Sequence, residues 1–299
     1  MRVLTLNLQH CLPNASAGEL HTADIRQPEQ ARAVLEALAA QIAEIDPDVV
    51  ALQEVDLRQK RSGGIDQAGV LADLLRMPYW RFAATYAGSV TGLRRRPRAT
   101  GLSSPTDDYL GPFLSALGQE PCGYGNALLS RLPVRQWRVQ RLGRGPHSVQ
   151  ARKDAPLGFR VWTASQRLLL GATLDTTLGD VNLGVTHLAT RQDTARKQLS
   201  QAWWSLSSLP GTPLLVGDFN LNSSELQRLA VGRELGEGNT YPALAPQQRI
   251  DHLLSAPLPT DATGAVAAGS VLRADDWGTR TFLVSDHAGT WGDLSLMGD

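Results

Sequence analysis

Short runs of apolar residues, most of them ending on polar or charged residues, recur along this chain of 299 residues. Helical spacing of apolar residues appears in three segments, and Pro28 suits the first turn of the earliest one. The predicted strands are residues 2–8, 48–56, 125–130, 167–174, 180–188, 212–220, 249–255 and 287–296, and the predicted helices are residues 28–46, 66–75 and 195–209. Because helices separate only some of the strands, the pattern favours mixed sheets covered by helices over a regular parallel barrel.

One long segment, at about residues 87–123, departs from this pattern. It is rich in Gly, Pro, Ser and Arg, and it is too long for a plain connector, which indicates a binding loop, a lid or a disordered insertion. Its basic run, Arg94–Arg98, is interpreted equally as a set of phosphate contacts or as a solvated charged stretch. No Pro- or Ser-rich linker divides the chain, so we expect a single domain over residues 1–299.

Composition narrows the class of protein. Hydrophobic residues make up 42% of the chain and charged residues 19%, which is enough for a large core. Lys plus Arg equal Asp plus Glu at 29 each, so no global positive field attracts nucleic acid or a membrane. Two cysteines, Cys11 and Cys122, exclude a disulfide-rich scaffold. With no signal-peptide pattern and no apolar run near ~18 residues, we expect a cytoplasmic monomer without stable membrane association.

Polar residues of a few chemical types follow the apolar runs. Taken singly, an Asp or Asn after a strand is usually a turn former, and a lone His is more often a structural imidazole. Repeated at one strand after another, the pattern predicts a single acidic pocket that contains histidine. The residues are Asn7, Glu54, His187, Asp218, Asn220, Asp251, His252, Asp286 and His287.

Three of these residues are hard oxygen donors that suit Mg²⁺ or Mn²⁺, namely Asn7, Glu54 and Asp286. They are few enough to leave coordination positions for water and a phosphate. Zinc is a weaker candidate, because the chain has no His-x-x-x-His or paired-Cys spacing. Four others are interpreted as proton handlers and oxyanion stabilisers: His187, Asp218, Asp251 and His287.

Seven segments, in order from residue 5 to residue 287, resemble the endonuclease/exonuclease/phosphatase (deoxyribonuclease I-like) superfamily. They are "TLNL", "LQEVD", "GNALLS", "THL", "GDFN", "IDH" and "SDH". The resemblance implies an α/β fold, a four-layer α/β sandwich of two packed mixed β-sheets flanked by helices, with the active site at one edge. The segment "RSGGIDQAGVL" also resembles uncharacterised bacterial members, and its Arg61 and Asp66 are placed either at the rim of the site or in the turn before the next helix.

The resemblance also implies roles for the metal and water side of the site. Glu54 looks like the principal metal ligand, helped by Asn7 and Asp286. Asp218 resembles the carboxylate that positions or deprotonates the attacking water, with Asn220 beside it. We expect Asn220 to point the same way as Asp218 if the strand continues.

The resemblance also implies roles for the residues around Asp218 and Asn220. Asp251 and His287 resemble a hydrogen-bonded Asp-His pair, His187 matches a second histidine, and Asn126 in "GNALLS" matches a phosphate-contacting position. We expect Phe219 to face the core and Gly217 to let the backbone pass close to the substrate.

The predicted function is hydrolysis of a phosphodiester or phosphomonoester, in which water attacks phosphorus in line with help from Mg²⁺ or Mn²⁺. Either Asp218 or His287 could take the proton of the water, while His187 and His287 are expected to donate as imidazolium. The partner is a phosphoester. One alternative is a nuclease specific for DNA or RNA, which the neutral net charge makes less favourable. The other is a non-catalytic phosphate-binding module, but such a module usually lacks a ligand or histidine of the site, and none is missing here.

Overall fold

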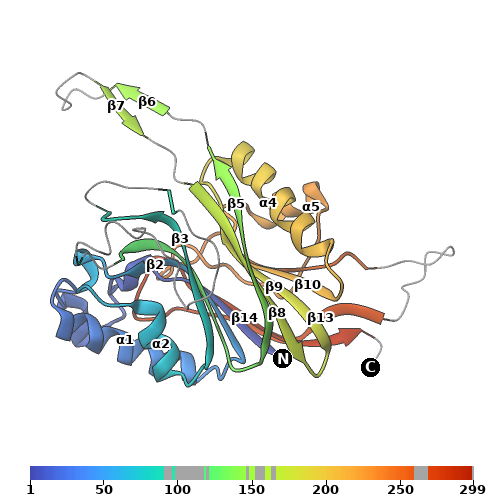
Figure 1. Cartoon of the computed structure of the whole chain (residues 1–299), viewed down its shortest axis with the longest axis horizontal. Coiled ribbons are helices and arrows are strands. Elements are labelled where there is room, and N and C mark those ends of the chain that lie inside the picture. The colour runs from blue at the N-terminus through green and yellow to red at the C-terminus, as the bar shows by residue number, and fades with distance from the viewer. Residues whose placement is uncertain are drawn as a thin grey trace.

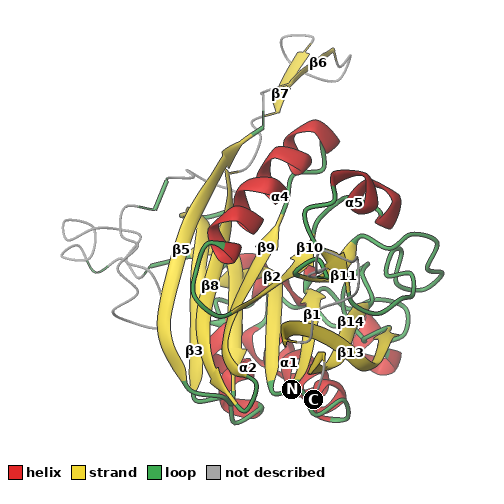
Figure 2. Cartoon of the chain, turned by 90° about the vertical axis from the view of Figure 1, so that its right-hand side faces the viewer, coloured by secondary structure: helices red, strands yellow, loops and turns green. Residues whose placement is uncertain are grey.

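Two six-stranded mixed sheets pack face to face in the computed structural model, with helices on both outer faces (Figures 1 and 2). The structure describes residues 1–90, 96–97, 118, 121–145, 148–151, 159–162, 166–258 and 269–297. Most of the segment 87–123 lies outside these residues, and so does the basic run apart from Arg96 and Pro97. The predicted four-layer α/β sandwich is confirmed. Among the described helices, none combines the length and apolar character needed to cross a membrane.

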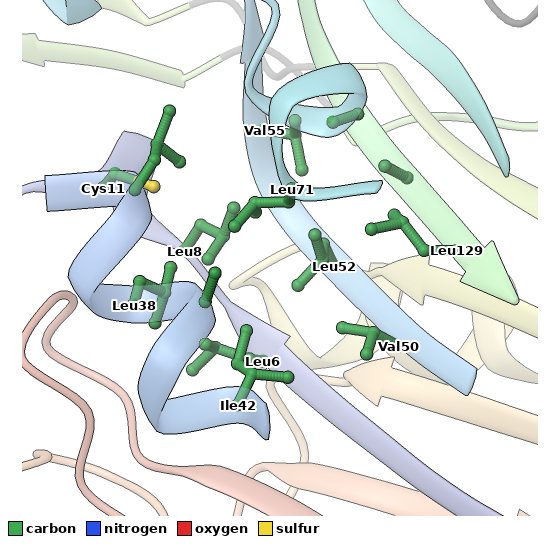
Figure 3. Packing of buried hydrophobic residues seen from close by; sticks show 14 of the residues in the cluster. Leu6, Leu8, Cys11, Leu38, Ile42, Val50, Leu52, Val55, Leu71 and Leu129 are labelled. Carbon is green, nitrogen blue, oxygen red and sulfur yellow. The ribbon is translucent and has the colours of Figure 1, made fainter. Parts of the chain in front are cut away.

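The first sheet has the strand order β13-β14-β1-β2-β4-β3 and is covered by α1 (Pro28–Ala43) and α2 (Gln67–Leu74). Its strands are β1 (Arg2–Asn7), β2 (Val49–Leu57), β3 (Tyr79–Ala87), β4 (Gly123–Ser130), β13 (Gly269–Arg280) and β14 (Gly289–Met297). Strand residues alternate between its two faces. Leu6 and Leu52 pack under the helices together with Leu38 and Leu71 (Figure 3), whereas Val3 faces the second sheet.

The second sheet has the strand order β11-β12-β10-β9-β8-β5 and carries α4 (Gln192–Ser207) and α5 (Ser223–Leu229) on its outer face (Figure 2). Its strands are β5 (Val134–Arg144), β8 (Gln166–Thr176), β9 (Gly179–His187), β10 (Thr212–Asp218), β11 (Arg233–Glu234) and β12 (Asp251–Ser255). A separate hairpin pairs β6 (Ser148–Ala151) with β7 (Phe159–Trp162). Three short 3₁₀ helices complete the described elements: η1 (Gln9–Cys11), η2 (Gly18–Thr22) and η3 (Lys60–Ser62).

Each sheet contains one parallel strand pair joined through a helix. β1 pairs with β2 through α1, and β9 pairs with β10 through α4. Parallel strands end at the same edge of a sheet, so Asn7 and His187 lie at the ends of their strands beside Gln53 and Asp218 respectively. β12 runs antiparallel to β10, and therefore its first residue, Asp251, lies opposite the last residue of β10.

Local signals explain where the first two helices begin and end. Pro28 occupies the first turn of α1, and the helix ends at Ala43, shortly before the left-handed Asp46 (φ 53°). Asp66 is the N-cap of α2, and its side chain accepts a hydrogen bond from the backbone N–H of Gly69. Of the two placements weighed for Asp66, the structure supports the turn before the helix.

Gly217, on β10, was expected to bring the backbone close to a substrate, and the structure shows a different reason for it. Its φ is 133°, and a Cβ at this position would lie 2.0 Å from the carbonyl oxygen of Thr186 on β9. The glycine therefore allows β9 and β10 to lie close together one residue before they end at His187 and Asp218.

Gly217→Ala should destabilise the protein more than Gly179→Ala, which places a methyl group at φ 85° on the first residue of β9, with nothing within 4 Å. Both substitutions strain the backbone by roughly 1–2 kcal/mol. Overpacking against Thr186 should cost Gly217→Ala about 1–3 kcal/mol more. Urea denaturation measures both free energies of unfolding, and equal losses would show that the strand approach is not tight.

Candidate active site

Three neighbouring strands of the second sheet place His187, Asp218 and Asp251 side by side at one edge. The register pairs Asp218 with His187 on one flank and with Asp251 on the other. Asn7 reaches across from the first sheet, and its Nδ2 donates a hydrogen bond to Oδ2 of Asp218 at 3.0 Å. The site is therefore assembled from both sheets.

These residues surround a pocket of about 370 Å³ at the edge of the sandwich. Seven of the predicted site residues line it: Asn7, Glu54, His187, Asp218, Asn220, Asp286 and His287. Five further residues complete the lining: Gln9, Thr190, Tyr241, Gln248 and Ile250. Asp251 lies behind the pocket wall and is fully buried. Seven of the residues that the sequence pattern placed in one pocket therefore do line a single pocket.

Asp251 and His287 form the predicted hydrogen-bonded pair. Nδ1 of His287 donates to Oδ2 of Asp251 at 2.9 Å, and the backbone N–H of His287 donates to the Ser285 hydroxyl. Burial alone would lower the pKa of His287, but the carboxylates of Asp251, Asp218 and Asp286 raise it to about 9. His287 therefore holds a proton on Nε2, the nitrogen that lies 3.9 Å from Asp218.

Asp218 is the most crowded carboxylate of the site. Its Oδ2 lies 3.4 Å from Nε2 of His187 and accepts from Asn7, while its Oδ1 accepts the backbone N–H of Asn220 at 2.9 Å. Burial, and then the like charge of Asp251, raise its pKa to about 7. A carboxylate with a pKa near neutrality can take up and release a proton during catalysis.

His187 lies between two carboxylates but is buried. Its Nδ1 is 3.8 Å from Oε1 of Glu54. Burial first, and then the positive charges of Arg167 and His287, hold its pKa well below the usual value. These conditions favour a neutral imidazole at His187, which differs from the expectation that both histidines donate as imidazolium.

Glu54 does not end its strand, because β2 continues to Leu57. It lies in a β-bulge, where Gln53 and Glu54 together face Asn126 of β4, and its φ of 55° is left-handed. The bulge turns the Glu54 side chain toward the pocket. Asn126 is only 2% exposed and is not among the residues that line the pocket, so its predicted phosphate contact remains a prediction.

The loop after β10 carries Asn220 into the pocket by a turn. β10 ends at Asp218, so the expectation of a continuing strand was wrong. Asn220 adopts a left-handed φ of 51°, and its Nδ2 donates to the carbonyl of Leu188 at 3.1 Å. Phe219 is fully buried, as predicted, and its ring stacks on His252 at 5.3 Å. His252 lies beneath the loop and is not part of the pocket lining.

Two carboxylates of the pocket keep exposed oxygens. The Glu54 side chain is 25% exposed and the Asp286 side chain 46%. Asn7 offers its Oδ1, which also accepts the backbone N–H of Gln9 at 3.0 Å. Hard, exposed oxygens of this kind fit Mg²⁺ or Mn²⁺.

A second acidic group of ligand atoms lies deeper, where atoms of Asp218, Asp251 and His287 come within 4.8 Å of one another. There, Asp251 and His287 already bind each other through one oxygen and one nitrogen. The exposed oxygens of Glu54 and Asp286 are therefore the better candidates for holding a metal ion.

Sequence reasoning also did not single out Tyr124, Arg167 and Tyr241, whose charges or rings affect the site. Burial, and then the charge of Glu54, raise the pKa of Tyr124 well above its usual value. Arg167 is close enough to lower the pKa of both Tyr124 and His187. The ring of Tyr241 lies 5.0 Å from the ring of His287. Tyr124 directly precedes "GNALLS", which was the one available signal; nothing in the local pattern distinguished the other two.

Comparisons with known proteins place this arrangement in a family. The sequence profile of the Endonuclease/Exonuclease/phosphatase family matches residues 4–287. No functionally curated protein sequence matches the chain. Solved structures share the fold: an endonuclease/exonuclease/phosphatase from Beutenbergia cavernae is 19% identical, with a TM-score of 0.58 over 100% of this chain and 72% of that one.

Two further solved structures carry more specific names. The mannosyl-6-phosphatase Bt3783 from Bacteroides thetaiotaomicron is 14% identical, with a TM-score of 0.58 over 99% of this chain and 100% of that one. D. rerio TDP2, complexed with a single-strand DNA product, is 15% identical, with a TM-score of 0.52 over 99% of this chain and 98% of that one. At sequence identities of 14% to 19%, the similarity to these three structures shows a shared fold alone.

Asp218→Asn should leave the fold intact and raise its stability at alkaline pH. The folded protein keeps the Asp218 proton up to about pH 7, whereas an unfolded chain loses it near pH ~4. The folded state therefore binds more protons in this window, and stability falls as the pH rises through it. Asn cannot ionise, so the unfolding midpoint of the variant in EDTA should exceed that of the wild type at pH 8 but not at pH 4. A lower midpoint at pH 8 would show that the carboxylate supports the fold.

Proposed function

The chain belongs to the endonuclease/exonuclease/phosphatase family, and we propose that it is a metal-dependent hydrolase that cleaves a phosphodiester or phosphomonoester by in-line attack of an activated water. The activities in the family name all cleave phosphoester bonds. The observation that carries the proposal is the position of Asp218, whose Oδ2 lies within 3.9 Å of the Nε2 atoms of both His187 and His287 in the pocket.

Asp218 is the better candidate for the general base. His287 is held protonated by Asp251, so it cannot accept the proton of the water, whereas Asp218 can. Asn7 and the backbone N–H of Asn220 fix the carboxylate of Asp218 from two sides, which orients it toward a water in the pocket.

His287 then acts as a donor to the phosphate. Its Nε2–H faces the pocket, and a preorganised donor of this kind stabilises the charge that develops on phosphate oxygens by roughly 3–4 kcal/mol. His187, as a neutral imidazole beside Glu54 and Asp218, can donate one hydrogen bond to the substrate or to the leaving oxygen.

Glu54, Asp286 and Asn7 would hold the metal ion, since their side-chain oxygens line the same pocket. When bound, Mg²⁺ or Mn²⁺ would neutralise charge on the non-bridging and leaving oxygens of the substrate.

The shape of the pocket favours a small phosphoester. Its volume of about 370 Å³ is typical of small-molecule sites, and Tyr241, Gln248 and Ile250 add an aromatic ring, an amide and an apolar side chain to its lining. Nucleic acid remains the second candidate, because D. rerio TDP2 shares the fold and was solved with a single-strand DNA product. The neutral net charge of this chain gives that candidate no general electrostatic support.

Hydrolysis of bis-p-nitrophenyl phosphate and p-nitrophenyl phosphate, in Mg²⁺, Mn²⁺ or EDTA, tests the proposal together with nicking of supercoiled plasmid. We expect metal-dependent release of p-nitrophenol and little nicking. Efficient nicking that falls steeply with added salt would favour the nuclease. Tight metal binding without turnover of any substrate would favour a phosphate-binding module instead.

Asp218→Asn should lower kcat by about 10²- to 10⁴-fold, because it removes the base while keeping the shape of the side chain. Asp73→Asn, on the exposed face of α2, is the matched control and should retain full activity. Wild-type turnover in Asp218→Asn would rule out Asp218 as the base.

A further inference from the structure

His252 directly follows Asp251 on β12, yet its side chain points away from the pocket. Successive side chains of a strand lie on opposite faces of the sheet. Asp251 therefore points toward His287, whereas His252 contacts Phe219 in the layer beneath α4 and α5. The His252 side chain is fully buried there. A buried imidazole behind the site is free to act on the backbone that carries the pocket residues.

Two contacts join the His252 ring to the turn that follows Asp218. Nε2 of the ring lies 2.8 Å from the backbone carbonyl oxygen of Leu221, which can only accept, so Nε2 is the donor. The ring of Phe219 stacks on the imidazole, with an interplanar angle of 24°. One ring thus holds the residues on both sides of Asn220. We infer that His252 is a positioning residue, which keeps this turn in the shape that orients the Asp218 carboxylate. The inference rests on the proposed function, in which Asp218 is the general base.

The turn needs such support because of its backbone. Asn220 adopts a left-handed φ of 51°, which residues with a side chain rarely keep unless their surroundings hold it. Its own side chain contributes one hydrogen bond, to the carbonyl of Leu188. In this conformation the backbone N–H of Asn220 donates to Oδ1 of Asp218 at 2.9 Å, while Nδ2 of Asn7 donates to Oδ2 at 3.0 Å. If the turn relaxed, the carboxylate would lose one of the two hydrogen bonds that fix its orientation.

The ring of His252 is anchored through its other nitrogen. Nδ1 lies 2.6 Å from Oε1 of Glu234, on β11. The same oxygen accepts the Ser223 hydroxyl at 3.0 Å and lies 3.4 Å from Nε of the buried Arg249. Because both ring nitrogens have partners, the plane of the ring and the direction of its Nε2–H bond are fixed. The Glu234 side chain is 16% exposed, so this anchor can be changed with less disturbance than the ring itself.

Two amide substitutions separate the two nitrogens of the ring. The amide nitrogen of glutamine lies about where Nε2 lies in histidine, and the amide nitrogen of asparagine lies about where Nδ1 lies. His252→Gln therefore keeps a donor for the carbonyl of Leu221, whereas His252→Asn keeps only the donor for Glu234. Both variants lose the stacked ring, so they form a matched pair that differs in the hydrogen bond to the turn.

The experiment combines amide hydrogen exchange, followed by NMR, with turnover of bis-p-nitrophenyl phosphate in Mn²⁺. In His252→Asn the amide of Asn220 should lose protection while that of Leu215, in the middle of β10, keeps it. The kcat of this variant should fall about 10- to 100-fold with little change in KM, because a misplaced base affects the transition state. His252→Gln should keep protection at Asn220 and a kcat nearer the wild type. Ile42→Val, a buried truncation in α1, controls for general destabilisation and should keep both.

The outcomes separate the inference from the proposed function. Unchanged protection of Asn220 in His252→Asn, or equal loss in both amide variants, would overturn the role of His252. Lost protection without a fall in kcat would overturn its link to catalysis. If the wild type hydrolyses no phosphoester, the proposed function fails, and the exchange data alone still decide whether His252 holds the turn.

Glu234→Gln provides a second test should both His252 variants fail to fold. It removes the carboxylate charge from the hydrogen bond that anchors the ring. Faster exchange of the Asn220 amide than in the wild type would support the inference, and unchanged exchange would overturn it.

Discussion

The site depends on one hydrogen bond that crosses between the two sheets. Nδ2 of Asn7, at the end of β1, donates to Oδ2 of Asp218, at the end of β10. Glu54 belongs to the first sheet, while His187 and Asp251 belong to the second. The apolar core between the sheets, built from residues such as Val3 and Val216, fixes their separation. Close packing in that core therefore sets the distances between pocket residues that come from opposite sheets.

Burial then gives these groups different protonation states. Asp251 is fully buried, and its charge keeps His287 protonated while it makes ionisation of Asp218 harder. His187, buried and close to the positive charges of Arg167 and His287, is driven toward the neutral form. A carboxylate that titrates near neutrality, a charged donor and a neutral imidazole result from residues of only two chemical types. Such an arrangement costs folding energy locally, and three apolar clusters elsewhere in the sandwich offset it.

The sequence predicted elements with a clear apolar period. It also singled out seven residues that line one pocket, because polar residues at the ends of apolar runs are easy to recognise. α1 and β9 were predicted from periodicity, whereas β13 was missed because it is an edge strand whose described residues include many exposed polar ones. The bulge at Glu54 could not be predicted, since a bulge is defined by the strand opposite it. The antiparallel direction of β12, which brings Asp251 to the edge by its first residue, also requires knowledge of pairing. Residues that affect the site through their charge, such as Arg167, leave no periodic signal at all.

The charge balance of the pocket supports the proposal that a cation binds there together with a phosphoester. Four carboxylates, Glu54, Asp218, Asp251 and Asp286, lie in or just behind the pocket, and Asp251 is hydrogen-bonded to the protonated His287. An anionic phosphate entering this field would be repelled unless positive charge entered with it. The exposed oxygens of Glu54 and Asp286 are where such charge would be most stable, and a bound divalent ion would turn the same carboxylates from a barrier into ligands. In the proposed function, the acidic lining would therefore bind metal and substrate phosphate as a unit, and Asp218 would handle the proton.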